Sequence, residues 1–110
     1  MVLFTSGQHL APMGDELPYA VTKGALLEST WSLSDRLIDR GITVNCLNPG
    51  PVDTGYAEGE VHARVAAMFP AGRWGTPEDA ARSVAWLVSD EAAWITGQVL
   101  SSEGGFRRWA

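Results

Sequence analysis

Apolar residues form short runs that alternate along the chain with longer segments of helical periodicity. The predominantly apolar runs cover residues 1–5 (MVLFT), 42–47 (ITVNCL) and 95–100 (ITGQVL). Runs of this kind are typical of strands that are buried on both faces of a parallel sheet. Strands that alternate with helices predict an α/β fold, in which helices cover a parallel sheet.

The first predicted helix begins at Pro18, which is acceptable in a first helical turn. It ends at Gly41, directly after the cation Arg40. Two neighbouring apolar rows run along it and are interrupted by Thr30 and Ser34, and together they predict a broad stripe that covers the sheet. The rows consist of Leu26, Leu33 and Leu37, and of Leu27, Trp31 and Ile38.

The second predicted helix has a well-marked start. Thr76 is a suitable N-cap, and Pro77 suits the first helical position. The acids Glu78 and Asp79 then fall in the first turn, where the helix dipole favours negative charge. The predicted buried stripe of this helix consists of Ala81, Val84, Ala85 and Val88.

The connection between the two helices contains a candidate lid. Residues 48–51 (NPGP) end the second strand sharply, because neither proline can donate to a sheet ladder. Residues 52–75 then form a long irregular connection that includes Val61, Val65 and Met68 at helical spacing. Long connections inside small domains often serve as active-site lids, so we expect a lid over about residues 52–75.

The composition narrows the classes of partner. The 110 residues suffice for one domain, and their net charge of −5, with no basic cluster beyond Arg107-Arg108, argues against nucleic acid or a membrane as partner. We expect both arginines to be solvated. Cys46, the only cysteine, is expected to be a small core residue in a protein of the reducing cytoplasm. His9 and His62 have no partner at ligand spacing, so we expect no metal site.

The segment from Ser6 to Lys23 carries the candidate chemistry. Tyr19 and Lys23 lie four positions apart on the first helix, which sets the ammonium beside the phenol. A free phenol has a pKa of about 10, and a nearby cation lowers it. A hydroxyl such as that of Ser6 could donate to a substrate carbonyl as charge develops on its oxygen. These residues predict a proton-transfer site, although a half-buried tyrosine that only packs would give the same pattern.

The candidate residues are expected at one edge of the predicted sheet. Ser6 follows the first strand, and residues 48–54 follow the second. Ligands of parallel sheets bind beyond the carboxyl ends of the strands. The predicted chemistry therefore lies at the edge where a binding site is expected.

Taken together, these motifs resemble the C-terminal half of the short-chain dehydrogenase/reductase family, over residues 1 to 106. The resemblance comprises the strand that ends in Ser6, the Tyr19-x-x-x-Lys23 helix, and the segments 48–54 (NPGPVDT), 72–79 (GRWGTPED) and 95–100 (ITGQVL). It implies a partial Rossmann-like three-layer fold. It also implies an NAD(P)-dependent oxidoreductase that interconverts a carbonyl and a hydroxyl by hydride transfer, and that acts on a small molecule as a homo-oligomer.

The resemblance implies a role for each matching residue. Tyr19 would be the general acid in carbonyl reduction and the general base in alcohol oxidation, and Ser6 would polarise the substrate carbonyl. Lys23 would lower the pKa of Tyr19 and hydrogen-bond the nicotinamide ribose. Residues 56–69 would form the substrate lid. The residues implied to bind NAD or NADP are Tyr19, Lys23, Pro49, Gly50, Val52 and Thr54.

The chain departs from the family pattern in one large respect, because nothing in it matches the glycine-rich turn of the family's N-terminal half. We expect residues 1–110 to be the C-terminal part of such a domain and to be inactive alone. Glu103 stands where aspartate is common, and Thr5 where a second serine is common. Two alternatives remain open. The chain would be a non-catalytic remnant that acts as an interaction module, or an unrelated α/β domain whose Ser6, Tyr19 and Lys23 do not converge on one cleft.

Overall fold

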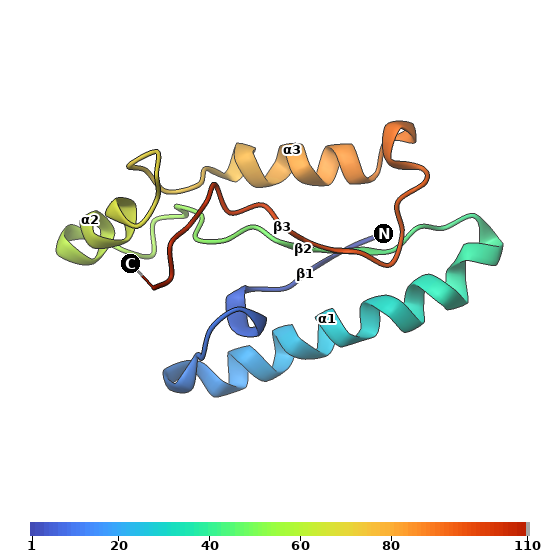
Figure 1. Ribbon diagram of the computed structural model, residues 1–110, viewed down its shortest axis with the longest axis horizontal. Coiled ribbons are helices and arrows are strands. Elements are labelled where there is room, and N and C mark those ends of the chain that lie inside the picture. The colour runs from blue at the N-terminus through green and yellow to red at the C-terminus, as the bar shows by residue number, and fades with distance from the viewer. Residues whose placement is uncertain (110) are drawn as a thin grey trace.

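The computed structural model describes residues 1–109, and strands alternate with helices along them. The strands are β1 (Val2–Phe4), β2 (Asn45–Asn48) and β3 (Val99–Ser101), and the helices are α1 (Leu17–Leu37), α2 (Gly59–Ala67) and α3 (Pro77–Leu87). Within these residues the strands form a parallel sheet in the order β1-β2-β3. Helix α1 covers one face and α3 the other (Figure 1). The predicted α/β fold with its three layers is confirmed.

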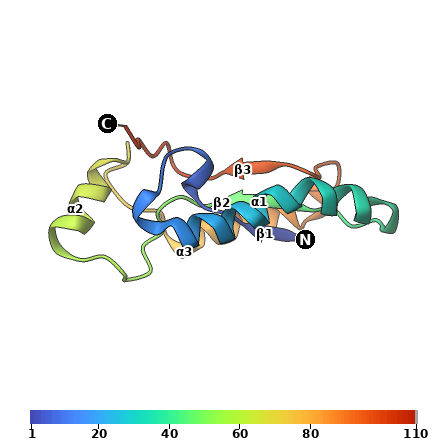
Figure 2. The ribbon, with the colours of Figure 1, turned by 90° about the horizontal axis from the view of Figure 1, so that it is seen from below.

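The carboxyl ends of the strands define the functional end of the molecule. The register sets Leu3 opposite Cys46 and Leu47 opposite Leu100, so all strands end at the same edge. Helix α2 and the C-terminal tail lie beyond this edge in two perpendicular views (Figures 1 and 2). Short 3-10 turns complete the path at η1 (Gly7–His9), η2 (Gly14–Glu16), η3 (Ile38–Arg40) and η4 (Asp90–Ala92).

The strands are shorter than predicted, and β2 and β3 begin later. The predicted strand 42–47 begins only at Asn45, and the predicted strand 95–100 begins only at Val99. Side chains replace the missing part of the ladder. Thr96 Oγ1 accepts the Val44 N–H at 3.0 Å, and Asn45 Oδ1 accepts the Gln98 N–H at 3.0 Å. Gly97, at φ +70°, leaves the extended conformation and so delays the start of β3.

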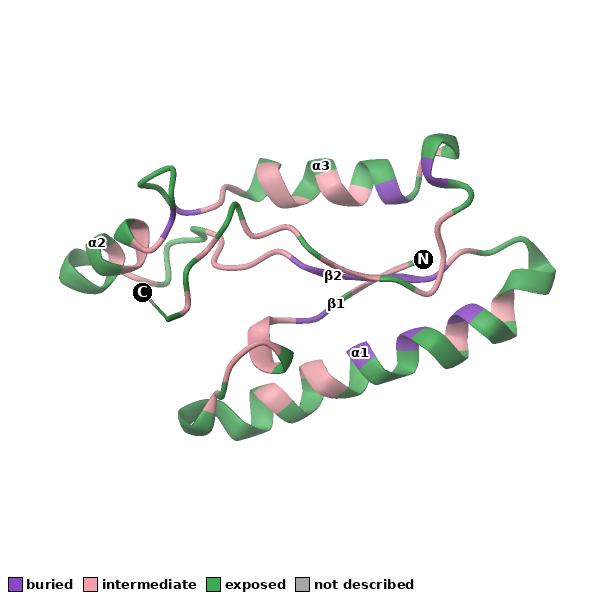
Figure 3. Cartoon of the chain, in the orientation of Figure 1, coloured by how far each residue is buried: buried purple, intermediate pink, exposed green. Residues whose placement is uncertain are grey.

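The face of α1 that meets the sheet also differs from the prediction. Thr30 and Ser34, expected to interrupt the stripe, are buried together with Leu27, whereas Trp31 is 47% exposed. Figure 3 shows the buried positions of α1 on the side of the helix that faces the sheet. Both buried hydroxyls are satisfied: Thr30 donates to a carbonyl of its own helix, and Ser34 Oγ lies 2.9 Å from the Thr96 hydroxyl. Small side chains allow a close approach of helix and sheet, since a Cβ at Gly97 would lie 3.1 Å from Ser34 Oγ.

Helix α3 begins as predicted but buries a different face. Thr76 and Asp79 form a reciprocal capping box, and Pro77 occupies the first turn. The buried side of the helix carries Leu87 and Ser83, whose hydroxyl lies 2.9 Å from that of Ser102 near the end of the sheet. Of the predicted stripe, Val84 is half-buried, like Ser83, whereas Ala81, Ala85 and Val88 are exposed.

The core centres on β2. All four of its residues are buried, including Cys46, as predicted. Burial raises the pKa of the Cys46 thiol, which keeps it in the neutral form. Within residues 1–109, every helix is too short or too polar to span a lipid bilayer.

The start of α3 generates a pH-dependent prediction. Asp79 Oδ2 accepts hydrogen bonds from Arg73 at 2.8 Å and from the Thr76 N–H at 2.9 Å, and these hold the pKa of Asp79 at about 2, below its ordinary 3.8. A lowered folded-state pKa stabilises the fold above the ordinary value, and this contribution disappears as the pH falls through about 2. We expect the stability difference between wild type and Asp79→Asn to shrink across that window.

Urea denaturation followed over a pH series measures this difference. Glu78→Gln is the matched control, because it removes a neighbouring acid that has no such hydrogen bonds in the described residues. A difference between wild type and Asp79→Asn that stays constant from neutral pH down to about pH 2 would contradict the prediction.

Candidate active site

A cleft of about 540 Å³ opens at the carboxyl edge of the sheet. Its walls come from the segment after β1, the start of α1, the turn after β2, the predicted lid and the C-terminal tail. Residues from these parts include Ser6, Tyr19, Gly50, Tyr56 and Arg108. Segments far apart in the sequence therefore meet at the edge where the parallel strands end, which is the expected binding position on such a sheet.

Ser6 is held by contacts on both sides of it. Its N–H donates to the Gln8 side chain at 3.1 Å, directly before η1. The preceding residue, Thr5, is 3% exposed, and its hydroxyl donates to the Lys23 carbonyl at 3.1 Å and accepts from the Gln8 amide at 2.8 Å. These bonds tie the end of β1 to α1 and present Ser6 to the cleft.

Tyr19 and Lys23 lie in the first two turns of α1, as their spacing predicts. Tyr19 is 46% exposed and lines the cleft. The Lys23 Nζ lies 5.9 Å from the centroid of the Tyr19 ring and donates to the Phe4 carbonyl at 3.3 Å. The structure thus brings Ser6 and Tyr19 to one cleft, with the Lys23 ammonium behind the phenol. Lys23 itself is not among the residues that line the cleft.

The residues of the turn after β2 that are implied to bind the cofactor do not all line the same cavity. Gly50 lines the cleft with Tyr19, whereas Pro49 lines a second cavity of about 220 Å³. Val52 forms a parallel bridge with Gly75. Thr54 is exposed in the following loop. Neither Val52 nor Thr54 lines the cleft.

The turn after β2 has a defined conformation. Asn48 is fully buried, and its side-chain oxygen accepts the Gly50 N–H at 3.0 Å. Gly50 has φ +66°, and a Cβ there would lie 3.0 Å from Glu103 Cβ. Glycine is therefore required both by the backbone conformation and by the space available.

The predicted lid is more ordered than an irregular loop, because it contains α2. His62 stacks on Trp74 with ring centroids 5.1 Å apart, and Tyr56 meets Trp74 edge-on at 5.5 Å. Tyr56 lines the cleft and remains 68% exposed, and its pKa is raised by partial desolvation and by the nearby Tyr19 and acidic groups. His62 Nε2 lies 2.9 Å from Asp53 Oδ2, and this hydrogen bond lowers the pKa of Asp53. In the described residues, no group of three potential ligands could hold a metal ion.

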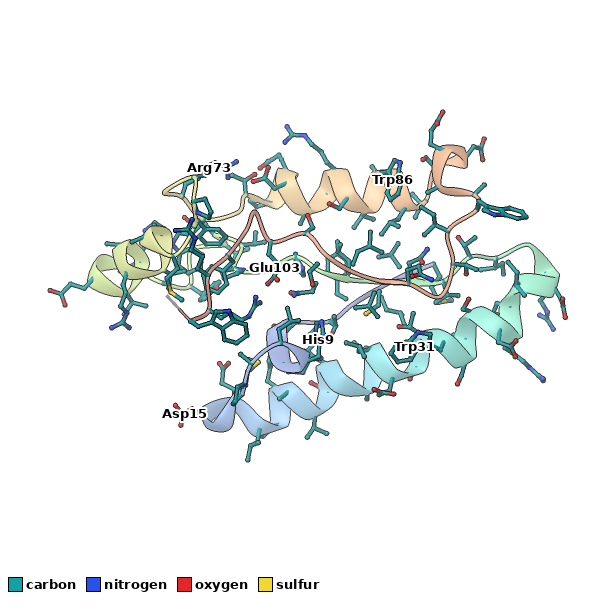
Figure 4. The ribbon with its side chains drawn as sticks, in the orientation of Figure 1. His9, Asp15, Trp31, Arg73, Trp86 and Glu103 are labelled. Carbon is teal, nitrogen blue, oxygen red and sulfur yellow. The ribbon has the colours of Figure 1, made fainter. Side chains whose placement is uncertain are left out.

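The sequence interpretation misplaced Arg108, a charged residue of the cleft. Arg108, predicted to be solvated, has a side chain that is only 13% exposed, and it forms a double hydrogen bond with Glu103. Glu103 lies at the sheet's carboxyl edge (Figure 4). The only signal in the sequence is an acid and a base five positions apart across Gly104-Gly105, which a turn can bring together.

Comparison with known proteins assigns the family. A family model described as enoyl-(acyl carrier protein) reductase matches residues 1–107. The chain belongs to the short-chain dehydrogenase/reductase family. It is 54% identical over 108 residues to the uncharacterized oxidoreductase YjdA of Bacillus subtilis (strain 168), across 98% of this chain and 43% of that protein.

Other members of the short-chain dehydrogenase/reductase family agree with this match. The chain is 38% identical over 108 residues to the 3-oxoacyl-(acyl-carrier-protein) reductase FabG of Escherichia coli (strain K12), across 94% of this chain and 44% of FabG. The crystal structure of the angucycline C-6 ketoreductase LanV with bound NADP superimposes on this chain with a TM-score of 0.86 and 34% sequence identity. The match covers 94% of this chain and 42% of LanV. The chain therefore spans less than half the length of each of these relatives.

The turn after β2 generates a second prediction. Gly50 and Gly55 both have positive φ, but a Cβ at Gly55 would meet open space, whereas one at Gly50 would meet Glu103. We expect Gly55→Ala to cost about 1–2 kcal/mol of unfolding free energy, from backbone strain alone. Gly50→Ala should cost more, because the Cβ and backbone of Glu103 cannot move aside as the tip of a flexible side chain can. If urea denaturation gives the two variants the same loss of unfolding free energy, the close contact between Gly50 and Glu103 is contradicted.

Proposed function

We propose that this chain is the part of an NAD(P)-dependent oxidoreductase that carries the proton-transfer residues for the interconversion of a carbonyl and a hydroxyl. The observation that carries the proposal is the meeting of Ser6 and Tyr19 in one cleft, with the Lys23 ammonium 5.9 Å from the Tyr19 ring. Family membership supports an oxidoreductase, and the bound NADP of LanV supports the type of cofactor.

Each of the three side chains would have a separate task in carbonyl reduction. The Ser6 hydroxyl would donate to the carbonyl oxygen and hold the substrate in place. The Tyr19 hydroxyl would give its proton to that same oxygen, and in alcohol oxidation the phenolate would take the proton back. The Lys23 ammonium would stabilise the phenolate, because an opposite charge nearby favours the charged form. The cofactor, when bound, supplies or accepts the hydride.

The residues present fit the nicotinamide end of NAD or NADP. Gly50 brings backbone to the cleft that Tyr19 lines, so a flat ring is not obstructed by a side chain there. We propose that Tyr19, Lys23 and the turn of Pro49, Gly50, Val52 and Thr54 contact the nicotinamide ribose and the adjoining phosphate. Only Tyr19 and Gly50 of this set line the cleft, which is consistent with a cofactor that extends beyond it.

We further propose that residues 1–110 correspond to the C-terminal part of the family's domain and are inactive alone. The chain spans 43% of YjdA and 44% of FabG, which supports this reading. We also propose self-association, because Trp31 and Trp86 remain 47% and 43% exposed on opposite helices (Figure 4). The buried free thiol of Cys46 supports a reducing compartment such as the cytoplasm.

Cofactor binding tests the role of Lys23. We would join the chain in frame to the portion of YjdA that it does not match, and follow nicotinamide fluorescence during titration with NADH and NADPH. We expect Lys23→Ala to weaken binding about tenfold, because it removes a charged hydrogen-bond donor. Arg36→Ala, which removes an exposed cation from the last turn of the same helix, should leave affinity unchanged.

The outcome distinguishes the enzyme from the interaction module. If Lys23→Ala leaves the affinity for NADH and NADPH unchanged, the proposed contact between Lys23 and the cofactor is wrong. A folded fusion protein that binds neither nucleotide would favour the non-catalytic alternative.

Turnover tests the role of Tyr19. In the same fusion protein, we expect Tyr19→Phe to lower kcat for carbonyl reduction by about 10²-fold or more, since it removes the proton donor. Tyr56→Phe is the matched control, because Tyr56 lines the same cleft and loses the same hydroxyl. A panel of simple ketones and aldehydes with NADPH supplies the assay. Equal effects of the two substitutions would mean that Tyr19 contributes packing alone.

A further inference from the structure

Glu103 and Arg108 form a largely buried ion pair in the wall of the cleft. Arg108 Nη1 donates to Glu103 Oε1 at 3.0 Å, and Nη2 donates to Oε2 of the same carboxylate. The two side chains are only 13% and 10% exposed. Buried ion pairs contribute little net stability, because desolvation offsets most of their attraction. Stability alone is therefore a weak reason for a charged pair at this place.

The two partners face different cavities. Arg108 lines the larger cleft together with Ser6 and Tyr19, whereas Glu103 lines the smaller cavity. Among the described residues that line the larger cleft, Arg108 is the only cation and Glu16 the only anion, and Glu16 is exposed. A molecule in the larger cleft would therefore contact the Arg108 guanidinium and not the Glu103 carboxylate.

The position of the guanidinium is fixed before any ligand arrives. Gly7 leaves room for it, since a Cβ there would lie 2.5 Å from Nη2. The Phe106 ring supports it, with Cζ 5.2 Å from the ring centroid. Glu103 is itself packed against Gly50 in the turn after β2. A charged group that is held in this way loses little conformational entropy when it binds a ligand.

Arg108 has donors left over. Its hydrogen bonds within the described residues go to Glu103 alone, and a guanidinium carries further N–H groups beyond those two. Such donors in a poorly hydrated wall bind an ionised oxygen more strongly than a neutral one, because charge-assisted hydrogen bonds are about twice as strong.

We propose that Arg108, held in place by Glu103, binds a carboxylate on the substrate, so that this cleft takes keto acids and hydroxy acids in preference to neutral ketones and alcohols. This inference rests on the proposed function, in which Ser6 and Tyr19 hold the reacting carbonyl of the same molecule. It adds a second anchoring point and sets the chemical class of the substrate.

Ligand binding to the 110-residue chain tests the inference without turnover. Saturation-transfer NMR would give dissociation constants for pyruvate, acetoacetate and levulinate, which differ in the spacing of ketone and carboxylate, and for their methyl esters. We expect at least one acid to bind about tenfold or more tightly than its ester, as a charged hydrogen bond predicts. Equal affinities for every acid and its ester would overturn the proposal, as would the absence of binding by all of the acids.

The variants separate recognition from packing. Glu103→Gln combined with Arg108→Gln removes both charges and leaves no unpaired buried carboxylate, and we expect it to abolish the preference for the acid while the chain stays folded by circular dichroism. Arg107→Gln removes the neighbouring exposed cation and should keep the preference. A folded double variant that still prefers the acid would show that the pair is only structural. If the double variant fails to fold, Arg108→Lys replaces it, because lysine keeps the charge but loses the planar fork. We expect Arg108→Lys to prefer the acid less strongly than the wild type, and an undiminished preference would overturn the proposal.

The result does not depend on the proposed hydride chemistry. If the 110-residue chain prefers keto acids but the fusion protein neither binds a nicotinamide cofactor nor shows turnover, the inference about Arg108 stands and the proposed function is refuted. If the fusion protein binds the cofactor and shows turnover but the chain has no preference for acids, the proposed function stands and the inference about Arg108 is refuted.

Discussion

The burial of β2 between two parallel neighbours is the constraint on which the rest of the structure depends. All four residues of this strand are buried, although two of them are asparagines. A buried amide is tolerated only when it is hydrogen-bonded. Asn45 meets this condition through Ile95 and Gln98, and Asn48 through Ser101 and Gly50. The polar groups of the core therefore also fix where β3 begins and how the turn after β2 is shaped.

The candidate site follows from this arrangement. Because β1 and β2 run parallel and in register, the chain leaves both strands at one edge, and Ser6 and Gly50 come to line the same cleft. Thr5 then joins the end of β1 to α1 through the Lys23 carbonyl. A single bonded path thus runs from the core strand to the helix that carries Tyr19.

The sequence predicted the layers, the parallel sheet and the edge of the sheet at which Ser6 and Tyr19 line one cleft, because these depend on local periodicity and on topology. It failed where contacts between distant segments decide. Thr30 and Ser34 were interpreted as gaps in an apolar stripe, yet both are buried. Thr30 bonds within its own helix, whereas the Ser34 hydroxyl bonds to Thr96, a partner that only the fold supplies. Arg108 was expected in solvent for the same reason, because its carboxylate partner and the room beside Gly7 exist only after folding.

The hydrogen bond from Lys23 to the Phe4 carbonyl has a consequence for assembly. In β1, the groups of Met1 and Thr5 bond to β2, so by alternation the Phe4 carbonyl faces the outer side of the strand. The Lys23 ammonium takes this acceptor at 3.3 Å. A further strand that extended the sheet at β1 would compete for the same carbonyl and set the ammonium free to turn toward Tyr19. The addition of a strand and the orientation of the Lys23 side chain would then be linked, since both use a single oxygen atom.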